Sequence, residues 1–279
     1  MKLQFFFPRW GSDALSWDLF CSRVKLAGFD GVEAGVPDDP AELALMQEAL
    51  YSHGLQWIAQ YWHSFESDVS LHVERYEQYL YRAAELKPVK LIAQTGKDYF
   101  SAEQNSLLFD VAARVTADTG VQILHETHRN KALYSAPASK IILTSHPDLQ
   151  IAADFSHWCT VSESFLEDQD ETVELAIQRA GHIHARVGHP EGPQVTDPRL
   201  PVWRDAVWAH LRWWRRIYQA HIQRGAAELT INPEFGPAPY MPQHPVTGEP
   251  LADQWAIIVW MKDWLQGALI SQDENIVIR

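Results

Sequence analysis

The chain has 279 residues, a formal net charge of -13 and a hydrophobic content of 46% that includes 12 tryptophans. This composition provides for a large core, and an acidic chain repels polyanions, so nucleic acid is not expected as a partner. No apolar run reaches the roughly 18 residues that a membrane span needs, the N-terminus lacks a signal-peptide pattern, and Cys21 and Cys159 match no metal or redox spacing. We therefore expect a cytoplasmic protein with reduced core thiols and no membrane partner.

One unit, a short apolar strand followed by a helix, is predicted eight times along the chain. The strands are expected at 3–7, 31–34, 55–61, 89–96, 121–126, 150–153, 183–187 and 228–232, and the helices at 16–27, 41–53, 69–86, 101–120, 137–146, 172–180, 205–224 and 253–265. Ser16 is available as an N-cap, Pro40 opens a helix, and Gly28 and Gly54 end helices.

Eight such units with near-continuous apolar strands favour a (β/α)8 TIM barrel, that is, an eight-stranded parallel barrel. The alternative is an open doubly wound sheet, which would not need eight units. No linker is visible, so we interpret residues 1–279 as one domain.

Four of the predicted strands end in ionisable residues. VQILHETHRN contains Glu126, LQIAADFSHW contains Asp154, HIHARVGHP contains His184, and AELTINPEFG contains Glu234. The carboxyl ends of all strands of a parallel barrel converge on one mouth, so these side chains would meet there. Two Glu, one Asp and one His suit one divalent ion, Mn²⁺, Co²⁺, Mg²⁺ or Zn²⁺. An ion-pair network across the mouth is the alternative.

Further polar and aromatic residues follow the strands and could stack on or hydrogen-bond to a polyol. They are Trp62, His63, His125, His128, Arg129, Trp158 and His189, with Glu33 after the second strand. Each alone is also explained as a packed core residue or a barrel-lining ion pair. Two proline-rich connections, 188–201 and 235–250, follow strands that end in candidate ligands. We interpret them as structured walls or lids over the site, with tolerated surface insertions as the alternative.

The predicted helix 205–224 is locally basic and aromatic. The residues at helical spacing that are expected to face the barrel are Val207, Leu211, Trp214, Tyr218 and Ile222. A solvated outer face is the simplest interpretation of the rest, and a subunit contact through Trp208 and Trp213 is the alternative.

From the second strand to the eighth, the sequence resembles the xylose isomerase-like barrel group. This group contains sugar isomerases, ketose 3-epimerases and inosose dehydratases, and it is related in fold to endonuclease IV-type enzymes. The resemblance rests on GFDGVEAG at 28–35, HETH at 125–128, ADFSHW at 153–158, HIHAR at 182–186 and PEFG at 233–236.

The resemblance implies roles for individual residues. Glu126, Asp154, His184 and Glu234 would be the metal ligands, and the two glutamates would also act as an acid and base pair. His157 would be the D-x-x-H histidine beside the substrate, and Arg186 would contact the substrate.

The implied activity is that of a divalent-metal-dependent isomerase or epimerase of a small carbohydrate or polyol, with proton transfer through a metal-stabilised enediolate. A metal-dependent dehydratase or lyase of a keto-polyol and a non-catalytic sugar-binding barrel remain alternatives. The endonuclease branch has further metal-binding histidines after the third and fourth strands. QTGKDY at 94–99, which contains the end of the fourth predicted strand and the residues after it, offers no histidine, so a trinuclear centre is not expected. RVGHPEG at 186–192 has no glycine-rich phosphate cradle, which favours an unphosphorylated ligand. The group's habit favours a homodimer or homotetramer.

Overall fold

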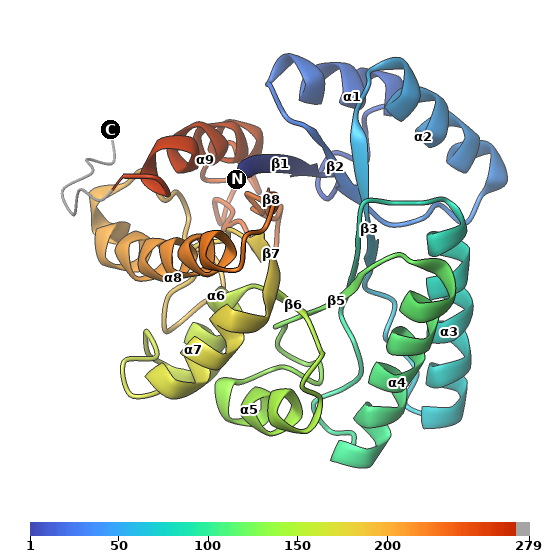
Figure 1. The fold of residues 1–279 in the computed structure, drawn as a ribbon. Helices are drawn as coiled ribbons and strands as arrows, with labels where there is room; N and C mark the ends of the chain where they lie inside the picture. The colour runs from blue at the N-terminus through green and yellow to red at the C-terminus, as the bar shows by residue number, and fades with distance from the viewer. Residues whose placement is uncertain (272–279) are drawn as a thin grey trace.

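The computed structural model describes residues 1–271, in which eight parallel strands close into a barrel in the order β1 to β8 (Figure 1). The strands are β1 (Lys2–Pro8), β2 (Gly31–Ala34), β3 (Gln56–Tyr61), β4 (Leu91–Ala93), β5 (Ile123–Glu126), β6 (Ile151–Ala153), β7 (Ala180–His184) and β8 (Glu228–Asn232). Lys2 to Phe5 of β1 pair with Glu228 to Ile231 of β8, and this pairing closes the barrel. The predicted (β/α)8 TIM barrel is thereby confirmed, and the open sheet is excluded.

Helices surround the strands (Figure 1). They are α1 (Trp17–Leu26), α2 (Pro40–Ser52), α3 (Val69–Glu85), α4 (Ala102–Thr119), α5 (Ala136–Ser145), α6 (Phe155–Ser162), α7 (Asp170–Arg179), α8 (Arg204–Gln223) and α9 (Gln254–Ala268), with a 3-10 turn at Pro201–Trp203. Local sequence explains several starts: Ser16 caps α1 by accepting from the amide of Leu19, and Ser101 forms a capping box with Gln104 on α4. Among the helices described, none combines the length and apolar character required to cross a membrane.

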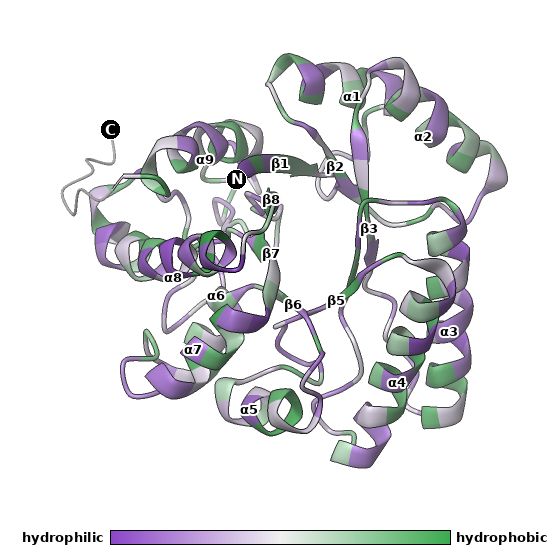
Figure 2. Ribbon diagram, in the orientation of Figure 1, coloured by the Kyte–Doolittle hydropathy of each residue, from purple (hydrophilic) through white to green (hydrophobic). Residues whose placement is uncertain are grey.

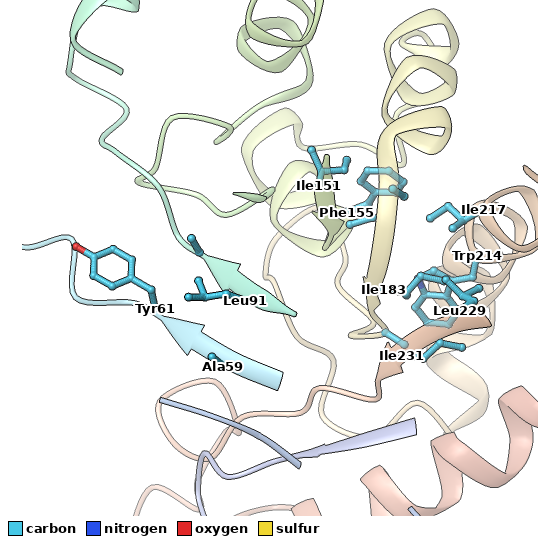
Figure 3. Close-up of a cluster of buried hydrophobic side chains, with 14 of the residues drawn as sticks. Ala59, Tyr61, Leu91, Ile151, Phe155, Ile183, Trp214, Ile217, Leu229 and Ile231 are labelled. Carbon is cyan, nitrogen blue, oxygen red and sulfur yellow. The ribbon is translucent and has the colours of Figure 1, made fainter. Parts of the chain in front are cut away.

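Side chains alternate between the inside and the outside of the barrel, as the two-residue period of a strand requires. Inside, one cluster fills the barrel with Phe6, Ile58, Ile92, Leu124 and Ala152. Outside, the intervening strand residues pack under the helices; Figure 3 shows Leu229 of β8 next to Trp214 and Ile217 of α8. The helices carry hydrophobic and hydrophilic residues in alternation, as expected of elements with one buried face (Figure 2).

The structure corrects some expected elements. Helix α6 was not predicted, because its eight residues follow Asp154 directly and look like a strand exit. Strand β7 begins at Ala180 and ends at His184, three residues earlier than expected, so Arg186 lies beyond the strand. The prediction that Ile222 faces the barrel is wrong, since 44% of it is exposed. Trp213 is buried within the subunit against Phe155, which removes it from any subunit contact.

Both cysteines are buried and free of disulfides, as expected.

Candidate metal centre

The four residues expected to bind metal are brought together. Glu126, Asp154, His184 and Glu234 each follow an inward-facing position by two residues, since Leu124, Ala152, His182 and Asn232 precede them in β5 to β8. All four are buried, and one candidate ligand atom from each lies within 4.8 Å of the others. The strand period and the barrel closure together therefore place three carboxylates and an imidazole at one point.

The donor atoms in this group have the geometry of an ion site. His184 Nδ1 lies 2.8 Å from Glu234 Oε2 and 3.3 Å from Glu126 Oε1. Nevertheless, these three atoms and Glu126 Oε2 are buried and make no hydrogen bond of acceptable geometry within residues 1–271. Buried polar atoms without partners are costly. Four of them converging on one point, with a mixed oxygen and nitrogen donor set, fit a divalent cation.

A buried polar chain holds His184 from the interior of the barrel. Its Nε2 lies 2.8 Å from Glu33 Oε1, and the other Glu33 oxygen lies 3.2 Å from His182 Nε2. His182 Nδ1 is 2.8 Å from Thr230 Oγ1, to which Lys90 donates at 3.1 Å. Because Glu33 accepts from Nε2, it leaves Nδ1 facing the carboxylates, which is the arrangement that ligating histidines require.

Asp154 is fixed on both oxygens. Its Oδ1 accepts from the amide and the hydroxyl of Ser156 at the start of α6, at 3.0 and 2.5 Å. Its Oδ2 accepts from Arg186 at 2.5 and 3.2 Å. Arg186 also donates to His157 Nε2 at 3.1 Å, while its Nη1 is buried and unpaired among the described residues. Arg186 therefore orders one wall of the site and retains a free donor.

The pKa values of the candidate ligands depend on burial, which disfavours their charged forms, and on nearby groups of opposite charge, which favour these forms. Burial raises the pKa of Glu126, and nearby His184 only partly offsets this. For Glu234, burial is outweighed by Arg186 and His184, which lower its pKa. Burial would also lower the pKa of His184, but Glu33, Glu234 and Glu126 raise it well above its usual value. A bound dication would lower the pKa of every ligand and displace the proton from His184.

A pocket of about 460 Å³ opens over this cluster. Among the predicted substrate-binding residues, Trp62, His63, His128 and Arg186 line it, together with Glu234. His157 lies behind this surface, with its ring centroid 3.9 Å from that of His128. Burial and the Arg186 charge lower the pKa of His128 to about 3, so it is neutral near pH 7.

Trp158 and His189 do not line this pocket. Because α6 begins at Phe155, Trp158 points into the core, where it stacks on Phe155 and donates to the carbonyl of Leu133. His189 packs on Trp203 and hydrogen-bonds with Gly192 through the backbone. Of the other candidates, His125 is buried against Thr95, and Glu33 supports His184.

The two long connections are joined to each other at the mouth. Gln194 donates to the carbonyl of Gly236 at 3.0 Å and accepts from its amide at 2.7 Å. Tyr240, from the second connection, lines the pocket with its ring 4.8 Å from the Arg186 guanidinium. The expectation of a structured wall holds for these residues.

Sequence reasoning missed other residues of the pocket. Arg9 and Trp10 follow β1, Gln94 follows β4, and Tyr240 lies in a long loop. Arg9 and Gln94 come directly after strands, at the same end as the metal ligands, and that position was a usable signal. Nothing in the local sequence marks Tyr240.

Comparison with known proteins identifies relatives of the fold. The family described as Xylose isomerase-like TIM barrel matches residues 21–207. No curated protein matches the chain.

Several solved structures share the fold. A 3-keto-D-glucoside 4-epimerase from E. coli has a TM-score of 0.59 and 13% identity over 95% of this chain and 99% of its own. A probable 3-DHS dehydratase from Bacillus anthracis has a TM-score of 0.57 and 17% identity over 95% and 99%. A xylose isomerase-like TIM barrel protein from Mycobacterium smegmatis, in complex with magnesium, has a TM-score of 0.60 and 9% identity over 95% and 96%. At these identities the likeness shows a common fold.

Proposed function

This chain belongs to the xylose isomerase-like TIM barrel family, and from that premise we propose that it is a divalent-metal-dependent isomerase or epimerase of a small carbohydrate or polyol. One observation carries the proposal: unpartnered buried atoms of Glu126, His184 and Glu234 converge beside a pocket of ligand size. Among its structural neighbours are an epimerase and a protein crystallised with magnesium, which supports the same interpretation.

Glu126, Asp154, His184 and Glu234 are the residues that would hold one Mn²⁺, Co²⁺, Mg²⁺ or Zn²⁺ ion. When bound, such an ion supplies Lewis-acid chemistry that polarises a carbonyl and acidifies the neighbouring C–H bond. Arg186 fixes Asp154 within the set, and Glu33 fixes the ring of His184. These contacts thus hold Asp154 and His184 in place for binding an ion.

Proton movement at carbon is assigned to the two glutamates. In epimerisation one glutamate removes the carbon-bound proton and the other returns a proton to the opposite face of the same carbon. In isomerisation one glutamate carries the proton to the adjacent carbon, and the hydroxyl proton moves to the former carbonyl oxygen. Glu234 reaches the pocket surface, whereas Glu126 lies deeper. Arg186 Nη1 is free to donate to a substrate oxygen, and neutral His128 can hydrogen-bond to a hydroxyl. Trp62 and His63 offer a surface on which a sugar can stack.

Dehydration is the second candidate function. If a hydroxyl lies beside the carbon that loses its proton, the second glutamate can protonate the leaving hydroxyl instead of carbon. A probable dehydratase is among the structural neighbours, which supports dehydration as the alternative reaction.

The test is exchange of carbon-bound hydrogen in D₂O by the Mn²⁺-loaded protein, with ketoses, aldoses and 3-keto-glycosides as probes. We expect deuterium at the carbon next to the carbonyl, detected by NMR, with unchanged substrate mass apart from the label. Glu126→Gln and Glu234→Gln should each abolish it, and Glu85→Gln, at an exposed position on α3, should not.

Loss of one water from the product would indicate the dehydratase instead. Metal and sugar binding without any exchange across the panel would indicate a non-catalytic sugar-binding barrel.

A further inference from the structure

The pocket extends beyond the metal centre toward the residues that follow β1 and β2. Its lining residues include His128, Arg186 and Glu234, which follow β5, β7 and β8, and a second group that lies after β1 and β2, namely Arg9, Asp13, Trp17 and Glu42. We call the first group the inner part of the pocket and the second group the outer part. None of the four candidate metal ligands lies in the outer part. A sugar ring placed for proton transfer by Glu234 occupies the inner part and leaves the outer part to be filled by something else.

The outer part contains a donor that is already ordered. Arg9 is 8% exposed, and its guanidinium lies over the rings of Trp17 and Phe20, at 4.5 and 4.7 Å. Its Nη2 donates to the carbonyl of Leu15 at 2.6 Å, whereas its Nη1 is buried without a partner among the described residues. Arg9 lines the pocket, and a buried donor without a partner is unfavourable until an acceptor reaches it.

Acceptors stand beside this donor. Glu42, in the first turn of α2, accepts from the indole of Trp17 at 3.3 Å, and Asp13 lies in the loop between β1 and α1. Two carboxylates and one guanidinium offer acceptors and a donor together, which is what a pair of neighbouring hydroxyls requires. Their charges sum to one negative, so the outer part disfavours a phosphate or carboxylate.

An aromatic side chain, Trp62, lies in the same pocket as these polar groups. Trp62 lines the same pocket with 46% of its surface exposed, and its ring is stacked on His63 with centroids 4.1 Å apart. The stacking on His63 fixes one face of the indole and leaves the rest available for an apolar ring face.

We propose that the outer part is a second sugar subsite, so that the substrate is an uncharged disaccharide or glycoside and not a free or phosphorylated monosaccharide. This inference rests on the proposed function for the placement of the first ring. The second ring would accept a hydrogen bond from Arg9 Nη1 and donate to Asp13 and Glu42.

The experiment measures sugar binding to the Mn²⁺-loaded full chain by calorimetry. The probes are glucose, xylose, glucose 6-phosphate, cellobiose, maltose, gentiobiose and xylobiose. At least one disaccharide should bind about tenfold or more tightly than its own monosaccharide, the change that one well-placed set of hydrogen bonds provides. The double variant Asp13→Asn, Glu42→Gln should bring this ratio close to one. Glu48→Gln, at an exposed position on the same helix α2 and outside the pocket, should retain it.

Three results would overturn the proposal: no disaccharide that binds more tightly than its monosaccharide, an unchanged ratio in the double variant, or tightest binding of glucose 6-phosphate. Both replaced residues are exposed, so the double variant is expected to fold. Its manganese stoichiometry and far-ultraviolet circular dichroism spectrum check this. The D₂O exchange assay separates the two claims. Exchange in monosaccharides without a disaccharide preference defeats only the subsite, and a disaccharide preference without exchange defeats only the catalytic proposal.

Discussion

Replacement of Glu33 by glutamine should weaken metal binding although Glu33 is not one of the four candidate ligands. Its carboxylate accepts from His184 Nε2 at 2.8 Å and lies 3.2 Å from His182 Nε2. Burial alone would raise the pKa of Glu33, but His184 and His182 bring it down to about 2, so it is ionised at neutral pH. Glutamine removes that charge and turns an amide donor toward one of two imidazole nitrogens.

The expected loss follows from the role of such partners. Carboxylates that orient ligating histidines contribute roughly 10-fold to 100-fold in metal affinity, or about 1 to 3 kcal/mol. Full burial of Glu33 and His184 excludes rescue by solvent, so we expect the upper half of this range. The assay is calorimetric titration of chelator-treated protein with Mn²⁺ at neutral pH, with Glu85→Gln as the matched control. A folded Glu33→Gln protein whose Kd stays within about twofold of the wild type would refute the reasoning.

Three further predictions concern the metal, the loops and pH. Chelator treatment should lower the melting temperature, and Mn²⁺ at about 100 times its Kd should restore about 2.7 kcal/mol of stability; a midpoint insensitive to Mn²⁺ would contradict this. Gln194→Ala removes both hydrogen bonds to Gly236 and should cost about 2 kcal/mol in urea unfolding, and an unchanged midpoint would show that the loops are not held this way. Burial lowers the pKa of His210 to about 4, below its unfolded value, so its contribution is complete above pH ~6.5 and is lost as the pH falls toward 4. In urea unfolding between pH 7 and pH 4, the free energy of unfolding should therefore fall less in His210→Asn than in the wild type. An equal fall in both proteins would contradict the lowered pKa of His210.

The barrel could be predicted because each strand is a short apolar run and each helix has readable ends. The four candidate ligands could be predicted for the same reason, since their position at strand ends fixes where a closed parallel barrel puts them. The inward position of His182 was not predicted, because the seventh strand was expected at 183–187 and is observed at Ala180–His184.

Other features depend on tertiary contacts. Helix α6 turns Trp158 into the core and leaves His157 beside the site. Because this helix was not predicted, Trp158 was interpreted as a residue of the pocket. Tyr240 reaches the pocket only because the long connection folds back over the mouth and is tied there through Gln194. The role of Glu33 depends on a partner 151 positions away along the chain, which local patterns do not reveal.

We propose that Glu126, Asp154, His184 and Glu234 bind one divalent ion. Anomalous diffraction from crystals grown with Mn²⁺ tests it most directly. We expect one anomalous peak bounded by the three carboxylates and His184 Nδ1, and we expect this peak to be absent in crystals of His184→Ala. A peak elsewhere, or none at saturating Mn²⁺, would contradict the metal centre and with it the proposed chemistry.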